Sequence, residues 1–189
     1  MVHATVYQHL PIDLVDVMTV LMEDILGTPT VKMILNRCQC NQRVLPQELV
    51  YTLAQETQKL LGNKGAYASL RQVGRSLAKN LIKQAPPEEW SRLFEQSLND
   101  FGYAQRVEKK TDRAFICQCV FYERLTQEQL QPIQHAVCWI GWGFIEGFMK
   151  TLEHIRSVEW AGRDIAHQRC EFIFKRTDLL DVLSKKNKL

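Results

Sequence analysis

The sequence lacks an apolar run long enough to cross a membrane. Its longest apolar stretch covers residues 136–149 and is interrupted by Glu146, whereas a membrane-spanning helix needs about 20 apolar residues. The N-terminus also lacks the basic and apolar segments of a secretion signal, because Asp13 and Asp16 interrupt the residues that follow it. These absences predict a cytoplasmic protein whose most apolar helix is buried inside a domain.

The cysteine pattern of a small secreted protein and a strong charge of one sign are missing as well. The chain has six cysteines in 189 residues, four of them in two Cys-Gln-Cys pairs, which indicates reduced thiols in a reducing compartment. Its net charge is +3, and no nucleic-acid reader motif accompanies that small excess. We therefore expect no nucleic-acid partner.

Recognisable catalytic motifs are also lacking. No Ser-His-Asp set, phosphate-binding loop or nucleotide-binding fingerprint occurs in a convincing context. The sequence therefore favours a binding protein over an enzyme.

The N-terminal half contains a series of helical patterns. The overall composition, 46% hydrophobic and 24% charged, suits one ordinary domain. Apolar residues at helical spacing predict helices over residues 12–26, 46–61, 67–85 and 86–101. The first of these is apolar around most of its circumference, so it is either a core helix or an arm that docks on a partner. Residues 31–40 leave the type of element open.

The helix over 67–85 carries a stripe of positive charge opposite its apolar face. Its members follow one another at four-residue steps: Arg71, Arg75, Lys79 and Lys83. Like charges at this spacing weaken an isolated helix. The stripe is either a solvated face or a surface for an anionic partner.

The period of the apolar residues then changes from that of a helix to that of a strand. Residues 103–109 and 114–122 predict a β-hairpin joined by 110–113. The second strand places four side chains on one face: Phe115, Cys117, Cys119 and Phe121.

A long apolar helix and a second hairpin complete the chain. Thr126 and Gln129 form a candidate capping box before the helix, which runs from about residue 132 to 155. The hairpin pairs residues 156–161 with 165–176 across a turn at 162–164. Three inward-facing residues alternate in its second strand: Cys170, Phe172 and Phe174.

This order of elements resembles the 4-vinyl-reductase-type domain and its relatives, the small subunits of the TRAPP vesicle-tethering complex. The residues that carry the resemblance are Val73-Gly74-Arg75-Ser76-Leu77, Cys138-Trp-Ile-Gly141-Trp-Gly143-Phe-Ile-Glu-Gly147 and Cys170-Glu-Phe172. The resemblance covers residues 45–176. We therefore expect an N-terminal helical extension over 1–44, a ligand-binding domain over 45–176 and a basic tail over 177–189.

The resemblance implies an α+β fold. N-terminal helices would pack with an antiparallel four-stranded sheet, made by two hairpins around the long glycine-containing helix, and an apolar cavity would lie between sheet and helices. Members of this group are linked to tetrapyrroles, to small aromatic molecules or to an acyl chain, and some assemble as dimers. A homodimer, or a heterodimer with a related subunit, is therefore expected.

The long helix is the expected wall of the ligand or dimer cleft. Small residues, among them Gly143 and Gly147, form a stripe that admits a partner helix, a flat ligand ring or simply the chain's own core. Trp139 and Trp142 lie toward the polar edge, where interface anchors are expected. The candidate ligand-binding residues are Val137, Cys138, Gly141, Trp142, Gly143, Phe144, Gly147, Phe148, His135 and His154. The two histidines are candidate axial donors to the magnesium of a chlorophyll-type ring.

A bound metal is a weaker expectation. Sensor members of the group hold zinc with two further cysteines and a Glu-x-x-Cys motif, a donor set suited to tetrahedral zinc. Cys138, Glu159 and Cys170 lie near the corresponding places, but Gly162 stands where the third cysteine would be. His167 could replace it only in a suitable hairpin register. The sequence therefore favours ordinary buried cysteines over zinc.

Three functions follow from these observations. The leading one is a non-enzymatic module that binds a hydrophobic ligand, with chlorophyll or another tetrapyrrole as the sharpest version, and acts as an accessory or assembly factor for photosynthetic complexes. The second is a TRAPP-like tether or scaffold that holds an acyl chain or partner peptide at a membrane surface. The third is a reductase of tetrapyrrole vinyl groups.

Overall fold

The computed structural model describes residues 14–38, 46–153 and 155–176. The described elements, in order, are α1 (Leu14–Leu26), α2 (Thr28–Cys38), α3 (Pro46–Gln84), the 3-10 turn η1 (Pro87–Glu89), α4 (Trp90–Asp100), β1 (Arg106–Lys109), β2 (Arg113–Cys117), α5 (Phe121–Gln127), α6 (Ala136–Leu152), β3 (Ile155–Asp164) and β4 (Arg169–Arg176). The predicted α+β class is therefore confirmed.

The four strands form one antiparallel sheet in the order β1-β2-β4-β3. Each predicted hairpin supplies one central and one edge strand. Along β4, Phe172 and Phe174 are buried in the core, while Glu171 forms an ion pair with Arg113 of β2. The sheet therefore has one apolar face toward the helices and one face that carries charge pairs.

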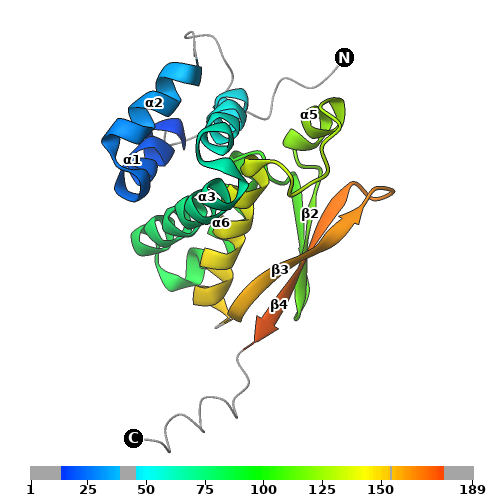
Figure 1. Cartoon of the computed structure of the whole chain (residues 1–189). Helices are drawn as coiled ribbons and strands as arrows, with labels where there is room; N and C mark the ends of the chain where they lie inside the picture. Colours follow the sequence, from blue (N-terminus) through cyan, green and yellow to red (C-terminus); the bar gives the residue numbers. More distant parts are fainter. Residues whose placement is uncertain (1–13, 39–45, 154, 177–189) are drawn as a thin grey trace, which may run out of the picture.

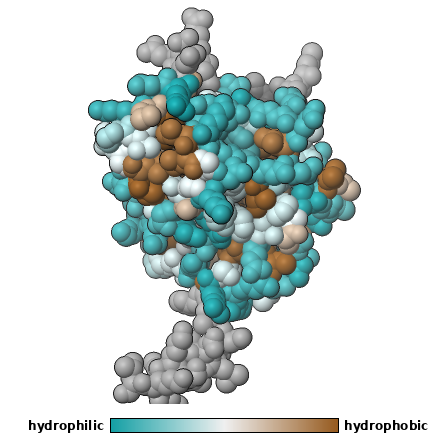
Figure 2. Space-filling model, viewed as in Figure 1, coloured by the Kyte–Doolittle hydropathy of each residue, from teal (hydrophilic) through white to brown (hydrophobic). Residues whose placement is uncertain are grey.

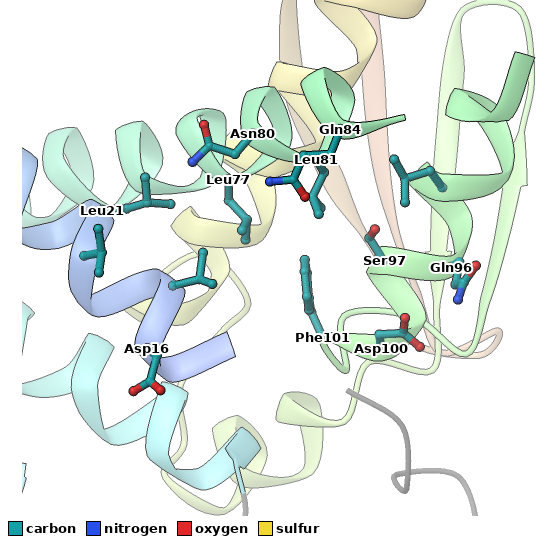
Figure 3. Close-up of a pocket in the computed structure, with 13 residues that line it drawn as sticks. Asp16, Leu21, Leu77, Asn80, Leu81, Gln84, Gln96, Ser97, Asp100 and Phe101 are labelled. Carbon is teal, nitrogen blue, oxygen red and sulfur yellow. The ribbon is translucent and has the colours of Figure 1, made fainter. Parts of the chain in front are cut away.

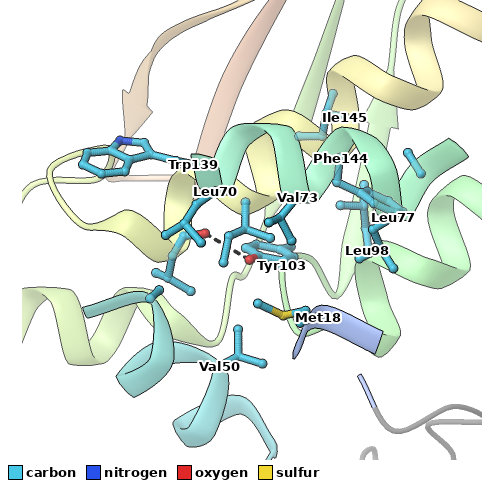
Figure 4. Packing of buried hydrophobic residues seen from close by; sticks show 14 of the residues in the cluster. Met18, Val50, Leu70, Val73, Leu77, Leu98, Tyr103, Trp139, Phe144 and Ile145 are labelled. Atoms are coloured by element: carbon cyan, nitrogen blue, oxygen red, sulfur yellow. Dashed lines mark hydrogen bonds between the residues drawn. The ribbon is translucent and has the colours of Figure 1, made fainter. Parts of the chain in front are cut away.

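Helix α6 lies between α3 and the sheet (Figure 1). Its circumference is apolar enough to be covered on both sides, and it is buried along most of its length. Helices α1 and α2 pack on α3. Met18 of α1, Leu70 of α3 and Phe144 of α6 belong to one continuous core (Figure 4). The open question about residues 12–26 is thus answered for the described part: α1 packs on its own chain.

Glycines end or bend two of the helices. Gly27 ends α1 with a φ of 80°, and Gly62 interrupts α3 with a φ of 67°. Both values lie in the left-handed region that glycine adopts without steric cost. The two helices predicted around residue 62 are therefore the two halves of one kinked element, and the undetermined run after residue 31 is part of helix α2.

The first hairpin and the capping box differ from their predictions. Strand β2 ends at Cys117, because Gln118 has a φ of 57° and leaves the sheet, and Phe121 then begins α5. The prediction that Cys119 and Phe121 continue the strand face is wrong. The capping box is wrong too: Thr126 lies within α5 and its hydroxyl donates to the carbonyl oxygen of Tyr122, 2.9 Å away.

The second hairpin turns later than predicted. Gly162 lies inside β3, at an irregularity in its pairing with β4, and the chain turns through residues 165–168. Glycine at a bulge lets the strand continue past the extra residue, so the predicted turn at 162–164 is wrong.

The described residues include no helix long and apolar enough to cross a lipid bilayer. In the view of Figure 2, apolar side chains gather over α1 and α2. Val20 and Met33, on these two helices, are 58% and 50% exposed. Residues 1–13, 39–45, His154 and the tail over 177–189 lie outside the described part, so the expectations for them stay predictions.

Candidate functional site

The glycine stripe of α6 contacts helix α3 of the same chain. A Cβ atom at Gly143 would lie 2.0 Å from the carbonyl oxygen of Arg71, and one at Gly147 would lie 2.7 Å from Cβ of Ala78. Gly74 of α3 meets α6 in the same way, 2.1 Å from the carbonyl oxygen of Ile140. The expectation that Gly143 and Gly147 form the approach surface of a ligand or dimer cleft is therefore wrong, because α3 already occupies that space.

A buried carboxylate joins the two helices beside these glycines. Glu146 is 3% exposed, and its carboxylate oxygens form ion pairs with side-chain nitrogens of three cations: Arg71 at 3.1 Å, Arg75 at 2.8 Å and Lys150 at 2.9 Å. Burial alone would raise the pKa of Glu146, but the hydrogen bonds from Lys150 and Arg75 and the charge of Arg71 lower it overall. The first half of the predicted basic stripe thus neutralises a buried acid, and Lys79 and Lys83 are its exposed remainder.

The two tryptophans of α6 are held inside the fold. The indole nitrogen of Trp139 donates to the carbonyl oxygen of Ile133 at 2.7 Å, and that of Trp142 donates to the carbonyl oxygen of Val158 at 2.7 Å. The guanidinium carbon of Arg71 lies 3.9 Å from the Trp142 ring centroid. Trp139 is 5% exposed, so the expectation that it anchors an interface is wrong. Trp142 is half-buried, and its role at an interface stays a prediction.

Three further candidate ligand residues belong to the core. Phe144 and Phe148 are fully buried with ring centroids 5.0 Å apart. Val137 is fully buried, and its carbonyl oxygen accepts a hydrogen bond from the Tyr103 hydroxyl at 3.0 Å (Figure 4). The ring of Tyr103 lies against Gly141, where a Cβ atom would be 2.6 Å away.

A small apolar cavity does lie between α6 and the sheet, where the resemblance implies one. Cys138, Gly141 and Trp142 line it from α6, and Trp160 and Phe172 line it from the sheet. Its volume is about 50 Å³, whereas sites for drug-sized ligands measure roughly 300–1,000 Å³. The space between helix and sheet therefore does not accommodate a tetrapyrrole in this conformation.

Two of the four weak metal candidates meet at this cavity. Cys138 and Cys170 line it together with Cys119, which the strand prediction had placed elsewhere. Burial raises the pKa of the Cys138 thiol to about 12, which favours the protonated form over the thiolate that metals bind. Glu159 lies 3.6 Å from Lys175 at the surface, and His167 pairs with Asp164. Within residues 14–38, 46–153 and 155–176, no group of three or more His, Cys, Asp or Glu is arranged to hold a metal.

His135 is buried at the start of α6, where its side chain caps the helix N-terminus. Its Nδ1 accepts from the backbone N–H of Val137 at 3.1 Å, and its ring stacks on Tyr51 at 4.0 Å. Burial lowers the pKa of His135 to about 4. The other predicted axial donor, His154, lies outside the described residues.

A ligand-sized apolar groove lies on the opposite side of α3, between α1, α3 and α4 (Figure 3). Its volume is about 410 Å³, within the range of small-molecule sites. Its apolar lining comes from all three helices and includes Val17, Val20, Leu21, Leu77, Leu81 and Leu93. The sequence signal for it was the apolarity of residues 12–26 on more sides than one neighbour can cover.

Three polar groups stand out in this groove. Asp16 of α1 and Asp100 at the end of α4 lie on opposite sides of it, and Ser97 lies one turn before Asp100 (Figure 3). Burial raises the pKa of Asp100, an effect that a hydrogen bond from Gln96 partly offsets. None of these residues belongs to a recognisable sequence motif, because a groove formed by three helices has no local motif.

Comparison with known proteins adds no relative. The chain matches no family model, no curated protein and no solved structure. The described part is thus an α+β domain with an antiparallel four-stranded sheet and a ligand-sized apolar groove, and this architecture is the class to which we assign it.

Proposed function

We propose that the chain is a non-enzymatic module that binds a hydrophobic molecule in the groove between α1, α3 and α4. The observation that carries the proposal is the groove itself, which offers about 410 Å³ lined mainly by aliphatic side chains. Exposed apolar surface of this kind is costly unless something covers it. Leu77 and Leu21 form buried walls, while Val20 is 58% exposed, so a ligand can enter without unfolding the core.

The finer identity that we propose is a relative of the 4-vinyl-reductase-type domain and of the small TRAPP subunits. The order of helices, hairpin, glycine-bearing helix and hairpin supports it. The same resemblance suggests a cytoplasmic accessory factor that dimerises and works beside a membrane protein complex of photosynthesis. Chlorophyll or another tetrapyrrole is then the first natural ligand to try, with the hydrocarbon tail in the groove.

Fluorescence titration with the neutral apolar dye Nile red tests the proposal. We expect saturable binding with one site per chain, because the groove removes the dye from water. Val20→Gln should weaken binding by about threefold or more, since it replaces an apolar contact by a polar one. Met33→Gln is the matched control: Met33 is similarly exposed but lies on α2, outside the groove lining.

Two results would count against this function. Absence of saturable dye binding to the intact chain would remove the groove as a ligand site. Equal weakening by Val20→Gln and Met33→Gln would place the dye elsewhere. If the dye binds, addition of chlorophyll tests the tetrapyrrole version: displacement of the dye supports it, and failure of chlorophyll to displace the dye contradicts it.

A further inference from the structure

The polar groups of the groove are unbalanced in charge. The exposed Asp16 is the charged residue that lines it from α1, and the partly buried Asp100 is the one from α4. Helix α3 contributes the uncharged amides of Asn80 and Gln84. No lysine, arginine or histidine is among the described residues that line the groove, although the whole chain has a net charge of +3.

Neither groove carboxylate is neutralised as Glu146 is. Among the ion pairs formed by the described residues, none includes Asp16 or Asp100. Asp100 is partly buried, so its charge is less screened than that of a fully exposed acid. A cation that entered the groove would therefore meet two carboxylates that have no cationic partner among the described residues.

Ser97 adds an unused hydrogen-bonding group beside Asp100. The residue is 4% exposed and lines the groove, where Figure 3 shows its hydroxyl oxygen. That hydroxyl has no hydrogen-bond partner within the described part of the chain. Because Ser97 and Asp100 are three residues apart on one helix, they lie on the same face. The hydroxyl is therefore free to form a hydrogen bond with a ligand that enters the groove.

We propose that the groove selects an amphiphile with a hydrocarbon body and a positively charged, hydrogen-bond-donating head, that is, a protonated amine. The aliphatic walls take the hydrocarbon, Asp16 and Asp100 attract the charge, and the Ser97 hydroxyl accepts a hydrogen bond from the head. A carboxylate-headed lipid of the same length meets like charge instead. This inference rests on the proposed function, because it names the ligand class of the same groove. It favours an amine-headed amphiphile over chlorophyll, which carries no protonated amine.

Displacement of Nile red by matched twelve-carbon compounds tests the inference. Dodecylamine, dodecanol and dodecanoate carry a positive, a neutral and a negative head, and each is used below its micelle-forming concentration. We expect dodecylamine to bind about tenfold more tightly than dodecanol, and dodecanoate to bind more weakly than dodecanol. Dodecyltrimethylammonium, a cation that cannot donate a hydrogen bond, should lie between dodecylamine and dodecanol.

Variants locate the preference within the groove. In Asp16→Asn/Asp100→Asn, dodecylamine and dodecanol should bind within about twofold of each other, because the attraction of the two charges is gone. Ser97→Ala should lower the affinity for dodecylamine toward that for dodecyltrimethylammonium. Glu95→Gln is the matched control: Glu95 is an exposed acid on α4 that does not line the groove, so the amine preference should be unchanged.

Acidification gives an independent readout. The ratio of dodecylamine to dodecanol affinity should fall as Asp100 protonates, and this should happen at a higher pH than for an ordinary aspartate because burial raises its pKa. Equal binding of the amine and the alcohol to the unaltered chain would overturn the inference while the proposed function stands. Failure of every compound and of the dye would overturn the proposed function itself.

Discussion

Helix α3 meets its neighbours in opposite ways on two of its sides. Toward α6, glycines bring the backbones together, and three cations surround the carboxylate of Glu146. Toward α1 and α4 lies an apolar groove, whose two carboxylates form no ion pair with the described residues. The stripe of small residues on α6 therefore marks a contact already made within the chain. The apolar residues on several sides of α1 mark a surface that the chain itself covers only in part.

The largest effect that the comparison predicts is at Gly143. Gly143→Leu should destabilise the fold by at least about 4 kcal/mol or prevent folding, because even its Cβ would overlap the carbonyl oxygen of Arg71, a backbone atom that cannot rotate away. Urea unfolding followed by circular dichroism measures the loss.

The control for Gly143 comes from the groove side. Val20→Leu adds bulk where the groove has room, so its unfolding free energy should change by less than about 0.5 kcal/mol. If Gly143→Leu does not fold, Gly143→Ala provides a milder version, with an expected loss of about 2 kcal/mol or more. Unchanged stability in Gly143→Ala would mean that α3 and α6 are not packed backbone to backbone.

The next largest effect is at Glu146. Glu146→Gln removes the charge that Arg71, Arg75 and Lys150 share, and should cost about 3 kcal/mol because partly buried cations lose their partner. The lowered pKa of Glu146 means that its contribution is complete above its unfolded pKa and is lost as the pH falls through the folded value.

Glu159→Gln is the matched control for that change. Glu159 pairs with Lys175 at 3.6 Å on the sheet surface, where an exposed ion pair contributes roughly 0–1 kcal/mol. Equal losses in the two variants would show that the cluster at Glu146 is as weak as a surface pair.

A pH effect of intermediate size should come from His135. Burial lowers the pKa of His135 to about 4. As the pH falls below about 6.5, His135 therefore becomes protonated in the unfolded chain but stays neutral in the folded chain. Folding stability attributable to His135 is therefore complete above that value, and about 2 kcal/mol should be lost by pH 5. Protonation would also end the acceptance of the Val137 N–H by Nδ1.

Unfolding curves at several pH values measure this effect. His135→Asn keeps a side chain that can cap a helix but does not titrate, so its stability should depend less on pH between 7 and 5. His167→Asn changes an exposed histidine and should leave the slope nearly as it is. A slope in His135→Asn equal to that of the unaltered chain would contradict the buried neutral state of His135.

The sequence predicted the architecture better than the site. Alternation in 113–117 and 169–176 predicted the central strands, and proline and glycine marked the end of α1, the start of α3 and both ends of α4, because these signals are local. The partner of Gly143 could not be found that way: periodicity shows that a face is small, but not whether α3, a ligand or a second chain fills it. Cys119 and Asp100 acquire their surroundings only through distant segments.

The smallest expected effect is at Asp100, on the groove side of α3, and it should have the opposite sign to the effect at Glu146. Asp100 is partly buried, no cation from the described part of the chain pairs with it, and burial raises its pKa. The folded state disfavours the charge of such an acid. The free energy of unfolding therefore falls as the pH rises from the acid's unfolded pKa to its folded pKa. Asp100→Asn should therefore stabilise the chain at pH 7 by about 0.5 kcal/mol, whereas Glu146→Gln destabilises it. Urea unfolding of the two variants side by side distinguishes a carboxylate that holds the fold together from one that is kept for a ligand. A clear loss of stability in Asp100→Asn would show that Asp100 stabilises the fold, and it would remove the argument that this carboxylate is kept for a ligand.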